Sequence, residues 1–181
     1  MSRASRILGN DDGGPEVLWE DGERVFCREW RYAADGSLRN ALIVRLTGEH
    51  PTQAAVDRLV HEYALKDELD ERWAVRPKAL IRERGRAVLV LEDPAAEPLE
   101  HLLDGPMELG RFLRLAVAIA AALTQLHRRG LVHKDLKPAN ILVNAASEVR
   151  FTGFGIASRV SREPQALEPP ETIAEIGRAH V

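Results

Sequence analysis

The amino-acid sequence predicts an α+β protein with a sheet-rich first half and a helix-rich second half. Short strand-like runs separated by turn-forming dipeptides fill residues 17–44. After Pro94, apolar residues recur at the three- and four-residue spacing of an α-helix. We therefore expect a bilobal α+β fold: a complete first lobe made of an antiparallel sheet and one helix, and the first part of a helical second lobe.

The first half is expected to form an antiparallel meander crossed by one helix. Two Asp-Gly dipeptides close the turns between the strand-like segments EVLWE, ERVFCREWRYA and ALIVRL. A helix opens at Thr52 and is expected to continue to Asp70, because apolar residues recur there at helical spacing. Residues 78–84 and 86–92 then predict two further strands joined at Gly85.

The second half is expected to be dominated by one long helix. EPLEHLL predicts a short helix, and residues 109–129 predict a long one that ends at Gly130. ILVN and VRFTG predict two short strands after it. The apolar face of the long helix is predicted to comprise Leu109, Phe112, Leu113, Ala116, Ile119, Ala120, Leu123 and Leu126.

Composition narrows the class of protein. The 181 residues are 45% apolar and 29% charged, with a formal charge of -3, which gives no electrostatic reason to expect a nucleic-acid partner. The longest apolar run, LAVAIAAAL, is too short to span a bilayer, so no membrane insertion is expected. Cys27 is alone and forms no internal disulfide. These features predict a cytoplasmic location.

Residues 133–140, HKDLKPAN, carry the clearest chemical signal. An aspartate can accept the proton of a substrate hydroxyl, and an asparagine five residues later can turn its side-chain oxygen onto magnesium. The octet resembles the catalytic loop of protein kinases, H-R-D-x-x-x-x-N, with lysine in place of arginine. The resemblance assigns these roles to Asp135 and Asn140. With Lys137 the chain resembles the serine/threonine branch of protein kinases, in which a lysine at this position neutralises charge on the transferred phosphoryl group.

The resemblance to protein kinases extends toward the N-terminus. The segment LIVR, ending at Arg45, lies where kinases have V-A-I-K, and Glu62 in HEYAL lies like the glutamate of the following helix. Arg45 could therefore pair with Glu62 beside the nucleotide phosphates. VLVLEDPAAEPL resembles the hinge that holds adenine, with Leu91 as gatekeeper and Glu92 to Pro94 as the hinge itself.

Two departures from the kinase pattern bear on activity. The glycine-rich loop should lie between Trp19 and Trp30, but Gly22 is the one glycine there. The segment TGFG occupies the position of D-F-G, so Gly153 stands where the family has its magnesium-binding aspartate. We therefore expect weak or magnesium-independent nucleotide binding and slow chemistry.

The segments RGLVHKDLKPANILVN and FTGFGIASR resemble segments of the N-terminal kinase-like domain of large bacterial multidomain sensor kinases. This resemblance implies a first lobe over residues 17–92 and a C-terminally truncated second lobe over 93–174, after a flexible segment 1–16. Residues 175–181, EIGRAHV, look like a non-native tail. With the later kinase helices absent, the apolar face of the long helix is expected to stay partly exposed.

Three functions follow from these features. The first is an ATP- and magnesium-binding serine/threonine kinase-like domain that transfers phosphate to a protein hydroxyl through Asp135 and Lys137. The alternative is a pseudokinase that regulates downstream signalling domains of a larger parent, favoured by Gly153 and Arg45. A small-molecule phosphotransferase is disfavoured by Lys137 and Pro138, which such enzymes usually lack.

Overall fold

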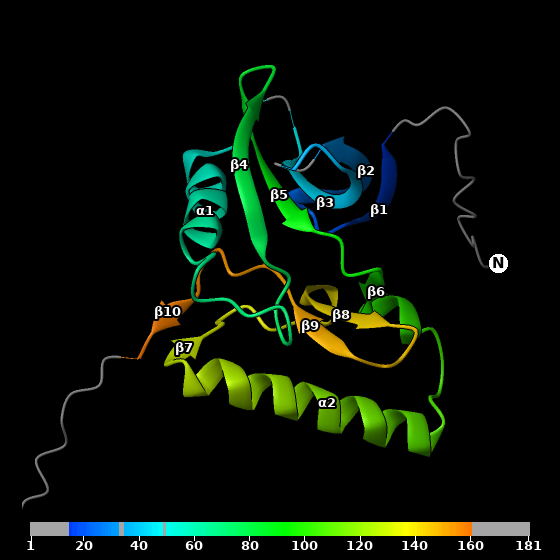
Figure 1. Cartoon of the computed structure of the whole chain (residues 1–181). Coiled ribbons are helices and arrows are strands. Elements are labelled where there is room, and N and C mark those ends of the chain that lie inside the picture. Colours follow the sequence, from blue (N-terminus) through cyan, green and yellow to red (C-terminus); the bar gives the residue numbers. More distant parts are fainter. Residues whose placement is uncertain (1–14, 33–34, 49, 161–181) are drawn as a thin grey trace, which may run out of the picture.

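The computed structural model describes residues 15–32, 35–48 and 50–160. Its upper half is a five-stranded antiparallel sheet with the strand order β1-β2-β3-β5-β4 (Figure 1). The strands are β1 (Glu16–Glu20), β2 (Arg24–Tyr32), β3 (Leu38–Leu46), β4 (Pro77–Glu83) and β5 (Arg86–Glu92). The predicted strands and the turn at Gly85, where φ is +81°, are confirmed.

Helix α1 (Gln53–Ala64) packs beside β4 and β5 (Figure 1). Thr52 caps it by accepting the Ala55 N–H at 3.2 Å, as expected for a threonine at this position. The helix is shorter than predicted, because the chain leaves it at Leu65. Leu65 and the following Leu69 bury their side chains in the lower half of the molecule, which a straight helix continuing from α1 would not reach.

The lower half contains one long helix with short strands and turns above it (Figure 1). A three-stranded sheet has the order β6-β8-β9, and β10 pairs with β7. The elements are β6 (Ala96–Pro98), the 3₁₀ turn η1 (Leu99–Leu102), α2 (Leu109–Arg128), β7 (Leu131–Val132), the 3₁₀ turn η2 (Pro138–Asn140), β8 (Ile141–Asn144), β9 (Val149–Phe151) and β10 (Ser158–Arg159). The sequence did not predict three of these strands, β6, β7 and β10, which have only two or three residues each.

Two apolar cores hold the halves together. The lower core packs α2 against β8, β9 and the segment after α1, with Trp73 and Phe154 almost fully buried. The upper core fills the α1 face of the five-stranded sheet. Leu142 of β8 belongs to the upper core although it lies in the lower half, so the two halves share one continuous apolar contact.

Helix α2 buries only part of the predicted face, in which Leu126 is buried and Ile119 and Leu123 pack partly against the lower core. Its buried residues are Leu115, Ala122 and Leu126, whereas Leu109 is 68% exposed and Phe112 is 54% exposed. The expectation that part of the apolar surface stays exposed is therefore confirmed. By length and composition alone, α2 is also apolar enough to cross a membrane, a test that the core helix of a soluble protein passes as well.

The predicted fold class is confirmed: the chain is α+β, with an antiparallel upper sheet, one helix packed on it, and few helices below. The predicted flexible segment 1–16 lies almost wholly outside the described residues. The predicted non-native tail, residues 175–181, lies entirely outside them. Both assignments remain predictions.

Candidate active site

The loop from β7 to β8 carries the residues predicted to be catalytic. Its anchor is His133, which is 2% exposed. The His133 Nε2–H donates to the Thr152 carbonyl at 2.9 Å, and Nδ1 accepts the Asp135 backbone N–H at 3.2 Å. Burial lowers the pKa of His133, which favours the neutral ring that this pattern of one donor and one acceptor requires. The imidazole thus fixes the backbone ahead of Asp135.

The loop brings Asp135, Lys137 and Asn140 together, as the sequence predicts. Asn140 is fully buried, and its Nδ2 donates to the Asp135 carbonyl at 2.8 Å and to Asp135 Oδ2 at 3.0 Å. Lys137 Nζ lies 3.5 Å from the same Oδ2. The carboxylate therefore has a cation and an amide beside it and faces the space between the two halves.

Arg24 of β2 enters this space and was missed by the sequence analysis. Its Nη2 donates to Asn140 Oδ1 at 3.0 Å, and its guanidinium forms a salt bridge with Asp21. Burial disfavours the charge of Arg24, but the hydrogen bond to Asp21 and the charges of Glu62 and Asp135 outweigh it and raise the pKa of Arg24. The signal available in the sequence is the pair Asp21 and Arg24, three residues apart around Gly22.

Glu62 of α1 points to the backbone of the TGFG segment. It is 2% exposed and accepts the Gly153 N–H at 3.0 Å. Burial raises the pKa of Glu62, against the opposing effects of the Arg24 charge and of the N–H groups of Gly153 and Phe154. The glutamate predicted for the nucleotide site is therefore bonded to the segment that replaces D-F-G.

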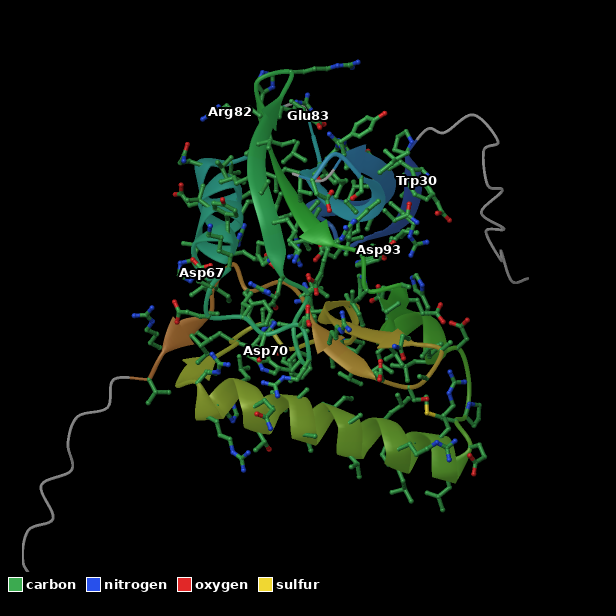
Figure 2. All side chains as sticks on the ribbon, in the orientation of Figure 1. Trp30, Asp67, Asp70, Arg82, Glu83 and Asp93 are labelled. Atoms are coloured by element: carbon green, nitrogen blue, oxygen red, sulfur yellow. The ribbon has the colours of Figure 1, made fainter. Side chains whose placement is uncertain are left out.

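The expected pair between Arg45 and Glu62 does not form. Arg45 pairs instead with Glu29 at 2.5 Å and Glu83 at 2.8 Å, and these two carboxylates raise the pKa of Arg45 although its partial burial opposes that shift. Glu83 lies near the upper end of β4 (Figure 2). The position predicted to meet the nucleotide phosphates is thus engaged in an ion-pair network away from the cleft.

The reason is the side-chain alternation of β3. Successive residues of a strand point to opposite faces of the sheet, so a shift of one residue exchanges the faces. Val44 packs in the upper core with Leu59 of α1, and Arg45 points to the other face. The β3 residues on the α1 face are Leu42, Val44 and Leu46, of which Leu46 lines the cleft cavity, and none of them carries a charge.

Gly153 fits its position tightly. Its φ is +81°, a conformation that side chains with a Cβ rarely adopt. A Cβ on Gly153 would lie 2.7 Å from Asn140 Oδ1. Any residue with a side chain at position 153 would have to displace the Asn140 amide from its bonds to Arg24 and Asp135.

The predicted hinge residues make structural contacts in this structure. Leu91 is fully buried in the upper core. The Glu92 carboxylate pairs with Lys78 at 2.9 Å and lies 3.5 Å from Arg150. Asp93, the residue after Glu92 (Figure 2), pairs with Arg28 of β2. Pro94 has no N–H with which it could donate a hydrogen bond to a base.

Large side chains fill the apolar space beneath the sheet. Trp19 of β1 and Phe26 of β2 stack with ring centroids 4.4 Å apart and an interplanar angle of 12°. Both belong to the same core as Leu91 of the hinge and Leu142 of β8. These rings therefore help to fill the apolar core that joins the sheet to β8.

A polar cavity of about 290 Å³ remains between α1, the β1–β2 turn and the catalytic loop. Its lining includes Arg24, Glu62, Asp135, Lys137 and Gly153. Among the described residues, no three histidine, cysteine, aspartate or glutamate side chains gather as a metal site. Because the Asn140 oxygen is bonded to Arg24 and Gly153 offers no carboxylate, the residues present do not fit a magnesium ion.

An antiparallel sheet with one helix, a shared interlobe core and an Asp-Lys-Asn loop at the cleft define a protein-kinase-like domain. The protein kinase domain family matches residues 42–174, so the chain belongs to that family. The family in general uses ATP and magnesium.

The chain resembles bacterial serine/threonine kinases over part of their length. Serine/threonine-protein kinase pkn2 of Myxococcus xanthus is 31% identical over 132 residues, which cover 71% of this chain and 15% of pkn2. Serine/threonine-protein kinase PknA of Mycobacterium tuberculosis is 40% identical over 80 residues, 43% of this chain and 19% of PknA. PknK of the same organism is 40% identical over 75 residues, 40% of this chain and 7% of PknK. The chain therefore spans less than a fifth of each of these relatives.

Proposed function

We propose that this chain is a pseudokinase-type regulatory module of a bacterial signalling protein. The observation that carries the proposal is the Asn140 amide. Its nitrogen donates to Asp135, and its oxygen accepts from the guanidinium of Arg24, a cation that disfavours a metal ion at the same oxygen. The position that supplies the metal carboxylate in the family holds Gly153.

The charges of the cleft support the same proposal. No cation of β3 lines the cleft cavity beside Glu62, because the β3 residue there is Leu46. Arg24, the cation that does approach Glu62, is already paired with Asp21. If each missing electrostatic contact costs about 10²–10³ in rate, two of them slow phosphoryl transfer by about 10⁴–10⁶. Starting from a typical kinase rate of roughly 1–100 s⁻¹, turnover becomes very slow.

A second candidate is a slow serine/threonine kinase that binds ATP. The observation in its favour is that Asp135 and Lys137 are assembled 3.5 Å apart, with the carboxylate held by Asn140. In this function Asp135 accepts the proton of a protein hydroxyl, and Lys137 neutralises charge on the phosphoryl group. A cytoplasmic location and downstream signalling domains of a larger parent as partners belong to both proposals.

The deciding experiment measures radiolabelled phosphate transfer from ATP to a general protein acceptor, with the full chain and with Asp135→Ala. For a pseudokinase we expect the same background signal from both proteins. Isothermal titration with ATP should give weak binding that hardly changes when magnesium is added. Magnesium-dependent transfer that Asp135→Ala abolishes would overturn the pseudokinase proposal and establish the kinase.

A further inference from the structure

A second cavity, of about 570 Å³, lies outside the cleft on the side of the hinge. It shares no lining residue with the cleft cavity. Its walls come from β1, from the segment around β6 and η1, from the turn between β8 and β9, and from the first turns of α2. Figure 1 shows β6, the β8–β9 turn and the start of α2 on the same side of the molecule. We call this cavity the hinge-side groove.

The hinge-side groove is rich in cationic hydrogen-bond donors. Three arginines and His101 line it, against a single carboxylate, that of Glu97. Arg28 is already paired with acidic partners. Arg111 and Arg114 are exposed, and neither forms a salt bridge with another residue in the part of the chain that the structure describes. Two arginines of the groove therefore remain available for an anionic partner.

The positions of these arginines are electrostatically unfavourable for the chain itself. Arg111 and Arg114 lie in the first turns of α2, at the helix end whose dipole disfavours cations. The nearest acidic group in sequence, Glu108, uses its carboxylate to cap the N–H groups of Gly110 and Arg111, although its charge also attracts Arg114. The charge of these two arginines is thus balanced only in part within the described residues.

Trp19 leaves one buried polar atom unsatisfied near the groove. Its ring lines the groove and is 5% exposed, and its buried Nε1–H has no acceptor among the described residues. A buried donor without a partner costs free energy, so it is usually satisfied by a ligand or by water. Like the arginines, this group requires an acceptor and not a donor.

The shape of the groove favours an extended peptide. The lining combines the cationic side chains of Arg111 and Arg114 with the apolar side chains of Leu18, Pro98, Leu102 and Val143. Side chains three residues apart on a helix lie roughly 5–6 Å from each other. Alternate side chains on an extended strand lie about 6–7 Å apart and point to one side. An extended segment with acidic residues at alternate positions and apolar residues between them matches both kinds of lining side chain.

We propose that the hinge-side groove binds an acidic, extended segment of a partner protein, with alternate carboxylates on Arg111 and Arg114 and apolar side chains on the β1 and η1 wall. The proposal is independent of whether the cleft transfers phosphate. It assigns to the kinase-like fold a docking surface for a regulatory partner, recognised by charge and by the alternation of an extended chain.

Fluorescence anisotropy tests the proposal. The full chain, fused to a carrier protein that keeps it in solution, is titrated into a short fluorescein-labelled peptide of alternating glutamate and leucine. We expect Arg111→Gln with Arg114→Gln to weaken binding about fivefold. Arg82→Gln with Arg86→Gln is the matched control, because both arginines are exposed at the far end of β4 and β5 (Figure 2). This control should bind as the unmodified chain does, and circular dichroism should show equal helix content in all variants.

Several outcomes would overturn the docking proposal. Absence of binding by the unmodified chain is one, and equal weakening by the control substitutions is another, because it would indicate unspecific attraction. Replacing the peptide glutamates by glutamine should abolish binding, and a peptide that still binds would remove the ionic argument. A single-stranded oligonucleotide that binds as well as the acidic peptide would show that any polyanion suffices.

Discussion

Gly153 is the residue at which this chain departs most clearly from the kinase pattern. It stands where the family has a metal-binding aspartate, yet its backbone and its neighbours now require glycine. The φ of +81° disfavours any Cβ, and the Asn140 amide fills the space where the Cβ would be. Restoring the aspartate would therefore require Asn140 and Arg24 to move first.

Substitution of Gly153 by alanine should destabilise the chain more than the same change at Gly85. Both glycines have φ of +81°, but a Cβ on Gly85 meets nothing within 4 Å. Gly85→Ala should thus cost about 1–2 kcal/mol for the backbone alone. Gly153→Ala should cost a further 1–3 kcal/mol, roughly the effect of overpacking. Urea unfolding measures the loss of stability in both variants. Equal losses would show that the Asn140 side chain moves aside without cost.

Glu62 predicts a distinctive pH dependence of stability. Burial raises its pKa in the folded chain, while the unfolded value is about 4.3. Between these two values the folded chain holds a proton that the unfolded chain has released. The stability that Glu62 contributes is therefore complete below about pH 4.3 and is lost as the pH rises through the folded pKa.

Thermal unfolding of Glu62→Gln from acid to neutral pH tests this sign. Relative to that variant, the unmodified chain should become less stable as the pH rises above about 4.3. Glu29→Gln is the control with the opposite sign. Burial of Glu29 is outweighed by hydrogen bonds from Arg45 and Arg31, which lower its pKa. The stability that Glu29 contributes is present above about pH 4.3 and is lost as the pH falls through its folded pKa. If the stability of both variants changed with pH in parallel, the opposite signs assigned to Glu62 and Glu29 would be contradicted.

Helix α2 is the element whose sequence pattern and structure differ most. Apolar residues cover more than half of its circumference, so the pattern alone does not decide which stripe is buried. β7 and β9 pack on α2 in this chain, and the stripe that they cover contains Leu115, Ala122 and Leu126. Leu109, Phe112, Leu113 and Val117 are left exposed on the other side, a surface of the kind that promotes self-association.

Polar substitution of the exposed stripe should leave the stability of α2 unchanged and improve its behaviour in solution. We expect Phe112→Gln and Val117→Gln to change the free energy of unfolding by less than about 0.5 kcal/mol each. Leu115→Ala, at a position that is 3% exposed, should cost about 2–5 kcal/mol. Size-exclusion chromatography should show less association for the polar variants. A loss for Phe112→Gln as large as that for Leu115→Ala would place the helix in a different orientation.

At the scale of the whole molecule, the two halves are coupled through Leu142. This residue is fully buried and lies in the upper core, although its strand belongs to the lower sheet. Ion pairs between the halves add to the contact, such as Arg28 with Asp93 at 2.6 Å. A kinase-like cleft that opens and closes would have to separate these groups.

Leu142→Ala should therefore weaken both halves together. The expected loss is about 2–5 kcal/mol, as for other large-to-small changes in a core. Hydrogen exchange followed by mass spectrometry should show faster exchange in β2, β3 and β9 alike, because β2 and β3 share the core that holds Leu142 and β9 pairs with its strand. Leu103→Ala, at a 49% exposed position, should have little effect. Faster exchange confined to β8 and β9 would show that the halves unfold independently.

The sequence by itself determined the fold class, the succession of strands along the chain up to β5 and the presence of the HKDLKPAN loop. These are local features: the residues of HKDLKPAN are close in the chain, so their joint placement at one loop needs no knowledge of distant contacts. The TGFG departure was equally visible, because a missing carboxylate is a fact of the sequence.

The tertiary structure alone decided what the cleft contains. Arg24 meets Asn140 although the two are far apart in the sequence, and no periodicity links them. The side of the sheet on which Arg45 lies depends on a one-residue register, since alternate side chains of a strand face opposite ways. Which stripe of α2 is buried depends on the elements that pack against it. Each of these features is set by long-range packing, which composition and spacing do not encode.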